Sequence, residues 1–236
     1  MELKYKRVLL KLSGEALAGD QKMGIKHEIV DALAGSIKKV VDMGGEIAIV
    51  IGGGNFWRGR SSGSMDRVRA DSIGMLGTVM NSIALADTLI QQGVPAKVYS
   101  AVAMEPIAEL YSNDKVLADL EAGKVTIFGG GTGNPFFSTD SAGALRAAQI
   151  GADVIFKATN VDGVYDKDPN KYADAVKFDS LSQSELLEKG LSVMDASAAS
   201  LCRDNGIDIL VFNLTDPENI VRAVSGENIG TVVFSK

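Results

Sequence analysis

The stretch "GGGTGNPFFST", residues 129–139, holds four glycines in its first five positions and a proline immediately before two phenylalanines. It follows the apolar run "KVTIF" at 124–128, which predicts a short buried strand. Ordering glycine costs more conformational entropy than ordering any other residue, so a dense glycine run marks a place where the backbone turns sharply or approaches something closely. We therefore expect this loop to contact a ligand.

Two further glycine-rich stretches come directly after predicted strands: "KLSGEAL" (11–17) and "IGGGNFWRG" (51–59). Loops that leave the carboxyl ends of parallel strands open on the same edge of the sheet, where ligands bind. Backbone amides without side-chain bulk, and the helix N-termini beyond them, form a site for phosphate. The three loops together predict a phosphate-binding edge.

The alternation of apolar runs with helical periodicity predicts an α/β fold, an open, mainly parallel eight-stranded sheet sandwiched between helices. Residues 1–236 are expected to form a single domain, because no linker, repeat or charge block divides them. Glycines 93, 151 and 206 stand where helix C-termini favour this residue. Seven of the strands are expected at 7–12, 46–51, 96–100, 124–128, 153–158, 208–213 and 231–235, and helices at 28–43, 66–92, 138–150, 195–205 and 217–225.

Within the longest predicted helix, Ile73, Leu76, Met80, Ile83 and Asp87 recur at helical spacing. The stripe fits packing in the core, and it also fits an interface between subunits.

The composition excludes several classes of function. A net charge of −6 argues against a surface that coats nucleic acid, and the N-terminal apolar run is too short for a signal peptide or a membrane span. The lone cysteine, Cys202, fits a reducing compartment, so we expect a cytoplasmic protein. His27 is the only histidine and begins a predicted helix, so neither a histidine-based catalytic triad nor a protein-held metal is expected.

Three cations are candidates to balance phosphate charge: Lys11 and Lys157, each at the end of an apolar strand, and Arg58 in the second glycine loop. A lysine at such a strand end is costly to bury unless an anion accompanies it. The sequence has neither G-x-x-x-x-G-K-[ST] nor G-x-G-x-x-G, so the common nucleotide-binding loops are absent. Asp140 and Asp195 could organise such a site or cap the helices that they precede. Trp57 fits packing or a contact between subunits better than stacking on a ligand.

Five motifs in order, "KLSGEAL", "IGGGNFWRG", "GTGNPFFSTD", "KATNVDGVYDKDP" and "VMDASA", resemble those of the bacterial uridylate kinases within the amino acid kinase family. The resemblance runs over essentially the whole chain. It implies transfer of the γ-phosphoryl group of ATP to UMP, giving UDP and ADP, in pyrimidine nucleotide biosynthesis. It also implies Mg²⁺ bound with ATP, a homohexamer, activation by GTP and inhibition by UTP.

The resemblance assigns residues to three roles. Catalysis would involve Lys11, Arg58, Lys157 and Asp140. ATP would be bound by Lys11, Leu12, Ser13, Gly14, Gly54, Arg58, Thr159, Asn160, Tyr165 and Asp168, and UMP by Gly53, Asp71, Thr132, Gly133, Asn134, Pro135, Phe136, Phe137, Ser138 and Thr139. No general base is expected, because the acceptor phosphate, with a second pKa of about 6, is already ionised at neutral pH.

Other interpretations remain. Acetylglutamate, aspartate and carbamate kinases would share the ATP loops, but "GTGNPFF" together with Asp71 favours a nucleotide acceptor. A nucleotide-sensing regulator without catalysis would be expected to lack Lys11 or Lys157, and both are present. A protein that serves only assembly leaves the three glycine loops unexplained.

Overall fold

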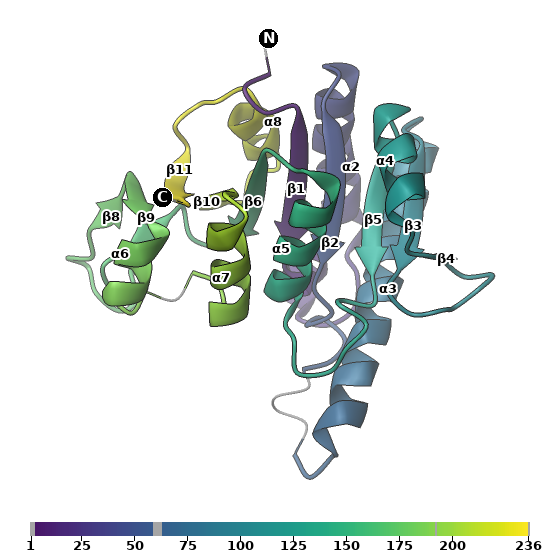
Figure 1. The fold of residues 1–236 in the computed structure, drawn as a ribbon, viewed down its shortest axis with the longest axis horizontal. Coiled ribbons are helices and arrows are strands. Elements are labelled where there is room, and N and C mark those ends of the chain that lie inside the picture. The colour runs from purple at the N-terminus through teal and green to yellow at the C-terminus, as the bar shows by residue number, and fades with distance from the viewer. Residues whose placement is uncertain (1–2, 59–62, 192, 236) are drawn as a thin grey trace.

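A large twisted sheet with helices on both faces forms the centre of the protein (Figure 1). The computed structural model describes residues 3–58, 63–191 and 193–235. In these ranges the sheet has nine strands in the order β4-β3-β5-β2-β1-β6-β10-β11-β9. The strands are β1 (Arg7–Leu12), β2 (Glu46–Ile51), β3 (Ala96–Ser100), β4 (Glu109–Leu110), β5 (Val125–Gly129), β6 (Val154–Thr159), β9 (Ser180–Ser182), β10 (Asp208–Asn213) and β11 (Gly230–Phe234).

The sheet is parallel from β4 to β10, after which β11 pairs antiparallel with β10, and β9 lies parallel to β11. The expected open, mainly parallel α/β sheet is therefore confirmed. It has nine strands where we expected eight, because β4 and β9 are only two and three residues long, too short to show a periodic pattern. A separate hairpin of β7 (Val164–Tyr165) and β8 (Lys177–Phe178) was not expected either.

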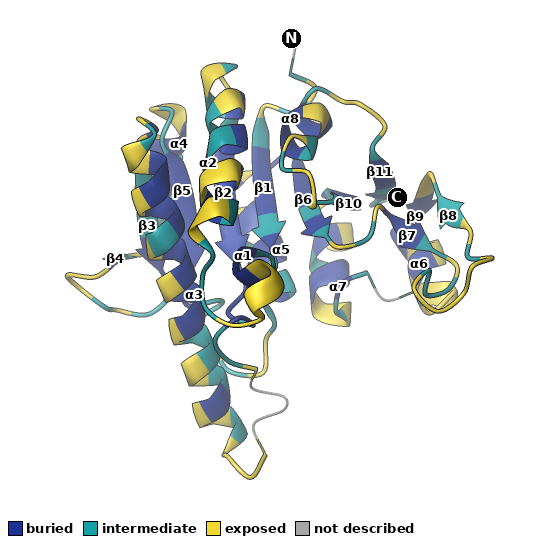
Figure 2. Ribbon diagram, turned by 180° about the vertical axis from the view of Figure 1, so that it is seen from behind, coloured by how far each residue is buried: buried dark blue, intermediate teal, exposed yellow. Residues whose placement is uncertain are grey.

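The helices divide between the two faces of the sheet (Figures 1 and 2). One core contains side chains of α1 (Gly14–Ala18), α2 (His27–Asp42), α3 (Arg67–Gln91) and α8 (Asn219–Val224). The other contains side chains of α4 (Asn113–Glu121), α5 (Thr139–Ile150), α6 (Gln183–Glu188) and α7 (Ala196–Asp204). A short 3-10 helix, Gly19–Gln21, follows α1. The five predicted helices are found within two residues of their expected ends, whereas α1, α4 and α6 were not expected.

The period of two along β1 determines where Lys11 points. Val8, Leu10 and Leu12 belong to the core on the α2 side, whereas Leu9 belongs to the core on the α5 side. Residues two apart on a strand share a face, so Lys11 lies on the α5 side. The same alternation in β6, with Phe156 and Ile155 in opposite cores, directs Lys157 to the α5 side as well.

Helix α3 extends well beyond the sheet, and much of its far end is exposed (Figure 2). Its predicted apolar stripe does not lie in the core, because Ile73, Leu76, Met80 and Ile83 are 36%, 52%, 49% and 39% exposed. The core interpretation was wrong because α3 is apolar around most of its circumference, and the side chains that it contributes to the core are Leu85, Ala86 and Leu89. In the described ranges, α3 alone is long and apolar enough to cross a membrane, but half of its most apolar window is buried inside the protein.

Candidate active site

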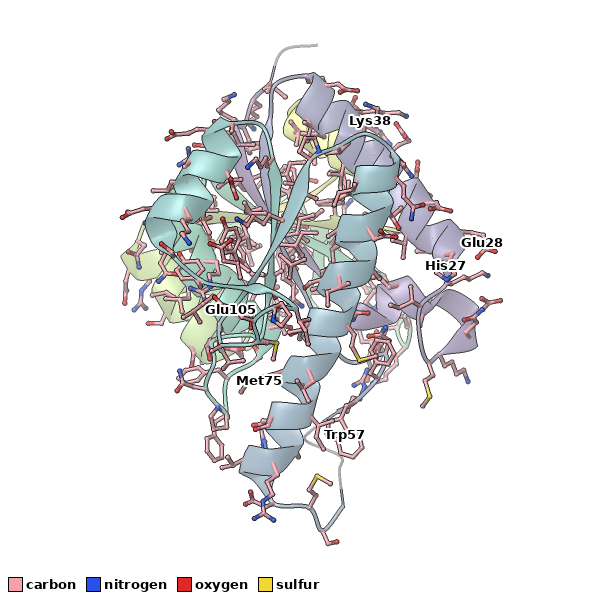
Figure 3. All side chains as sticks on the ribbon, turned by 90° about the vertical axis from the view of Figure 1, so that its right-hand side faces the viewer. His27, Glu28, Lys38, Trp57, Met75 and Glu105 are labelled. Carbon is pink, nitrogen blue, oxygen red and sulfur yellow. The ribbon has the colours of Figure 1, made fainter. Side chains whose placement is uncertain are left out.

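The three glycine loops meet in one cleft of about 620 Å³, as the sequence predicts. They follow β1, β2 and β5, which are neighbours in the sheet, and the N-terminal half of α3 forms the opposite wall. Trp57 lies beside that half of α3 (Figure 3). The lining includes Lys11, Ser13, Gly14, Glu15, Gly52, Gly53, Gly54, Trp57, Arg58, Arg67, Asp71, Gly74, Met75, Thr78, Gly131, Thr132, Asn134, Phe136, Phe137, Ser138, Thr139, Asp140, Val193, Met194 and Asp195.

Two lysines stand side by side near the ends of β1 and β6, and one of them, Lys11, lines the cleft. Lys11 and Lys157 are register partners on these adjacent parallel strands, and 12% of each side chain is exposed. Asp140 lies between them, with Oδ1 2.7 Å from the Lys11 Nζ and Oδ2 2.6 Å from the Lys157 Nζ. One carboxylate shared by two ammonium groups leaves the trio with a net positive charge.

The proton equilibria of this trio reflect burial and mutual charge. Burial raises the pKa of Asp140, but the positive charges and hydrogen bonds of Lys11 and Lys157 together outweigh this effect. The pKa of Asp140 therefore lies below its ordinary value. Burial and the charge of Lys11 lower the pKa of Lys157, against the opposing attraction of Asp140. The carboxylate is therefore ionised at neutral pH, and Lys11 presents its positive charge to the cleft.

The start of α5 is tied to the start of α7 through hydroxyl groups. Ser138 caps α5 by accepting hydrogen bonds from the backbone N–H groups of Asp140 and Ser141, at 3.0 and 3.2 Å. Asp195 caps α7 at the Ala198 N–H and accepts hydrogen bonds from the hydroxyls of Ser138 and Ser141. The question left open by the sequence is thus answered: Asp140 organises the lysines, and Asp195 caps a helix while holding the serines beside Asp140.

The other side of the cleft carries two further ion pairs, of which Arg58 with Glu15 is the more exposed. Arg58 pairs with Glu15 of the first glycine loop. Arg67 donates to Asp71 Oδ2 at 2.8 Å, and the backbone N–H of Phe136 donates to the same oxygen at 2.8 Å. Phe136 has a φ of +72°, a left-handed conformation that costs a non-glycine residue energy, and the Arg67 guanidinium lies 5.6 Å from its ring centroid. Asp71 therefore connects α3 to the third glycine loop.

Most of the residues predicted to bind UMP or phosphate line this cleft, but several predicted residues do not. Lys157, predicted to be catalytic, reaches Asp140 but does not line the cleft. Leu12 is fully buried in the core, and Gly133 and Pro135 lie in the third loop without lining the cleft. The predicted adenosine-binding residues lie further along, at the end of β6 and in the segment that includes β7. There the Thr159 hydroxyl bonds to the Val161 carbonyl, the Asn160 carbonyl accepts from Asn213, Tyr165 bonds to Asp162, and Asp168 pairs with Lys171.

The structure adds Glu15, Arg67 and Thr78 to the site. Thr78 Oγ1 accepts a hydrogen bond of 2.8 Å from the Gly130 N–H, which fixes the third glycine loop to α3. A sequence signal exists for Arg67, since it precedes Asp71 by four residues on one helix. Glu15 stands within "KLSGEAL", but its pairing with a loop 43 residues away has no local signal.

Neither histidine nor a protein-held metal cluster contributes to the described site. His27 lies at the exposed start of α2, away from Trp57 (Figure 3), and does not line the cleft. The described ranges contain no group of three His, Cys, Asp or Glu side chains suited to hold a metal ion. Both oxygens of Asp140 already face lysines.

The chain also matches known proteins in sequence and in structure. Residues 6–213 match the model of the amino acid kinase family. The structure superimposes with a TM-score of 0.95 on a UMP kinase from Bacillus anthracis, which is 36% identical, with 98% of this chain and 97% of that chain covered. For a UMP kinase from Ureaplasma parvum the TM-score is 0.93 at 36% identity, with 99% and 100% covered. A uridylate kinase from Archaeoglobus fulgidus gives 0.73 at 30% identity, with 96% and 99% covered. With its fold, its glycine-loop cleft and these matches over nearly its whole length, the chain belongs to the amino acid kinase family and is an enzyme.

Proposed function

We propose that the protein is a UMP kinase, which transfers the γ-phosphoryl group of ATP to UMP and releases UDP and ADP. The observation that carries this proposal is the trio of Lys11, Asp140 and Lys157, of which Lys11 and Asp140 line a cleft built from three glycine loops. The similarity to UMP kinases over nearly the whole length supports UMP as the acceptor.

In the proposed reaction, a phosphate oxygen of UMP attacks the γ-phosphorus of ATP. The bond between that phosphorus and the β,γ-bridging oxygen breaks, and its electron pair leaves with ADP. A loose phosphoryl-transfer transition state requires alignment and positive charge more than covalent help. The ammonium groups of Lys11 and Lys157 supply charge that is already fixed by Asp140 before the substrates bind.

No residue needs to remove a proton from the acceptor. The second pKa of a phosphate monoester is about 6, so UMP is mostly dianionic at neutral pH. This agrees with a cleft whose described lining holds no histidine.

We assign the two nucleotides to the two ends of the cleft. Asp71, Gly53 and the segment 132–139 would hold UMP, with the ribose hydroxyls donating to Asp71. Ser13, Gly14, Gly54 and Arg58 would border the ATP phosphates near Lys11. Thr159, Asn160, Tyr165 and Asp168 would hold the adenosine, beyond the cleft lining.

ATP would enter as its Mg²⁺ complex, and so the ion belongs to the substrate. The cationic side chains of the site, Lys11, Arg58, Arg67 and Lys157, each face a carboxylate. Two highly charged nucleotides would therefore find little surplus positive charge. Neutralisation of phosphate charge is the chemistry that Mg²⁺ supplies when bound.

The remaining parts of the proposal concern the protein in the cell. We infer one domain over residues 1–236, a cytoplasmic location, a role in pyrimidine nucleotide biosynthesis, and a homohexamer activated by GTP and inhibited by UTP. The exposed apolar stripe on α3 supports assembly. Light scattering should give about six times the chain mass of 24.8 kDa, and a monomer mass at working concentration would rule out the hexamer.

A coupled assay of ADP release tests the function itself. With MgATP as donor, UMP, CMP, dUMP and AMP are offered as acceptors, each with and without GTP or UTP. UMP should give the highest kcat/KM, and radiolabelled UDP should be recovered. Turnover of another acceptor in preference to UMP, or none at all, would reject the assignment.

A further inference from the structure

Two buried asparagines lie beneath the second glycine loop and form a closed pair. Asn55 Nδ2 donates to Asn81 Oδ1 at 2.9 Å, and Asn81 Nδ2 donates to Asn55 Oδ1 at 2.7 Å. Only 1% of Asn55 and none of Asn81 is exposed. Asn55 belongs to the loop and Asn81 lies on α3, so the pair joins two segments that are 26 residues apart.

Each amide makes one further hydrogen bond to backbone. Asn81 Nδ2 also donates to the Gly52 carbonyl at 2.7 Å, and Asn55 Nδ2 to the Gly24 carbonyl at 2.8 Å. The four N–H donors of the two side chains are thus all used. Burying an amide costs free energy unless its hydrogen bonds are satisfied, so this network stabilises one arrangement of the loop on the helix.

The backbone above the pair is packed closely. A Cβ on Gly53 would lie 2.6 Å from the Gly74 carbonyl oxygen, and one on Gly77 would lie 3.2 Å from the Gly53 carbonyl oxygen. The second glycine loop therefore rests directly on the backbone of α3.

The first glycine loop rests on the same network. A Cβ on Gly14 would lie 2.3 Å from the Gly52 carbonyl oxygen and 2.5 Å from Asn55 Oδ1. These two oxygens are the acceptors that Asn81 holds. A shift of either one would therefore move the contact surface of both loops.

We propose that Asn81 is a positioning residue for phosphoryl transfer. It does not line the cleft, but it fixes the Gly52 carbonyl and the Asn55 side chain, and through them the glycine backbone that faces the phosphates. This inference rests on the proposed function. It adds a residue that would not touch either nucleotide, whose effect is expected on alignment more than on binding. Misplacement of a reacting group by about 1 Å can cost about 100-fold in rate.

The test compares Asn81→Ala with Ser82→Ala. Ser82 is the next residue on α3 and is also fully buried, but its hydroxyl donates to the Thr78 carbonyl within the helix at 2.8 Å and not to a glycine loop. Asn81→Ala should lower kcat about tenfold or more, with KM for ATP within about threefold of the wild type. Ser82→Ala should keep kcat within about twofold. All rates are measured well below the melting temperature of each variant. Asn81→Ser, which keeps a hydroxyl donor, should show an intermediate kcat and provides a second variant should Asn81→Ala not fold.

A double-mutant cycle and hydrogen exchange separate positioning from general destabilisation. If the pair acts as one unit, Asn55→Ala and Asn81→Ala combined should lower kcat no further than the more damaging single change. Amide exchange of the peptide 50–58 should rise in Asn81→Ala relative to Ser82→Ala. Additive losses of activity, equal exchange, or kcat values in Asn81→Ala and Ser82→Ala that agree within threefold would each overturn the inference. Hydrogen exchange is measured without turnover, so it tests the role of Asn81 even if the wild type does not phosphorylate UMP. Lack of UMP phosphorylation by the wild type would reject the proposed function but not the role of Asn81 in holding the loop.

Discussion

The two walls of the cleft hold their charges differently. On the α5 wall, 12% of Lys11 and Lys157 and 16% of Asp140 are exposed, and each lysine lies within 3 Å of the shared carboxylate. On the other side, Arg58 and Glu15 of the first two glycine loops are 62% and 40% exposed, whereas Arg67 and Asp71 on α3 are 38% and 14% exposed. A buried charge without its partner is costly, so the trio keeps one geometry, whereas water screens the exposed pair and allows its partners to change. We therefore expect the chemistry to depend on the buried wall and substrate capture on the exposed wall.

The largest effect is expected from Lys11→Ala. It removes positive charge that the transition state needs, so kcat should fall by about 100-fold or more while binding of UMP changes little. Steady-state kinetics with both substrates varied would measure this. Lys38→Ala is the control, because Lys38 lies on the surface of α2 (Figure 3) and pairs with Asp42. A kcat near that of the control would show that Lys11 has no part in the chemistry.

Asp71→Ala tests whether the α3 side of the cleft binds UMP. Its Oδ2 is taken by Arg67 and the Phe136 N–H, so we expect Oδ1 to receive the ribose hydroxyls of UMP. Loss of a hydrogen bond to a charged group should raise KM for UMP about tenfold, with KM for ATP little changed. Equal increases in both constants would instead indicate that Asp71 serves mainly to hold the third glycine loop on α3.

Glu15→Gln should lower a KM where Asp71→Ala raises one, and the change should be smaller. If Arg58 leaves Glu15 to meet a phosphate, removing the carboxylate charge should lower KM for ATP by about two- to threefold at low salt, with kcat unchanged. The difference should vanish at high ionic strength. A tenfold loss of kcat would mean that Glu15 orients Arg58 during the reaction, and the contrast between the walls would then fail.

Acid should weaken the buried wall selectively. The pKa of Asp140 in the folded protein lies below its ordinary value of 3.8. Its ionised form therefore stabilises the fold above that pH, and this contribution disappears as the pH falls through the lower pKa of the folded state. The difference in urea midpoint between the wild type and Asp140→Asn should therefore be constant near neutrality and narrow below about pH 4. If the difference in urea midpoint stayed constant down to pH 2, the lowered pKa of Asp140 would be contradicted.

His27→Gln should have no effect on catalysis. The acid limb of kcat/KM for UMP should follow the second ionisation of the UMP phosphate near pH 6, because that group carries its own negative charge. The profile of the variant should overlay that of the wild type at a fixed Mg²⁺ concentration. Disappearance of the acid limb in the variant would make His27 the base.

The sequence predicts the parts of the site that follow from strand periodicity. Lys11 and Lys157 end apolar strands, and the alternation of their neighbours directs both to one face; the glycine loops follow from their position after strands. Pairings between distant loops could not be predicted. Glu15 with Arg58 and Asn55 with Asn81 depend on how closely glycine backbones approach α3, and no local pattern reports that approach. The very short strands, β4, β7, β8 and β9, exist because of tertiary pairing and carry no pattern of their own.

Trp57 gives the cleft an optical signal of its own. It is the only tryptophan in the chain, it lines the cleft, and its indole N–H is buried without a hydrogen-bond partner in the described structure. All intrinsic emission excited at the red edge of the tryptophan band thus originates in the cleft, at the residue next to Arg58. Titration with a single nucleotide should change the intensity or wavelength of that emission, so each ligand can be followed without a label or a coupling enzyme.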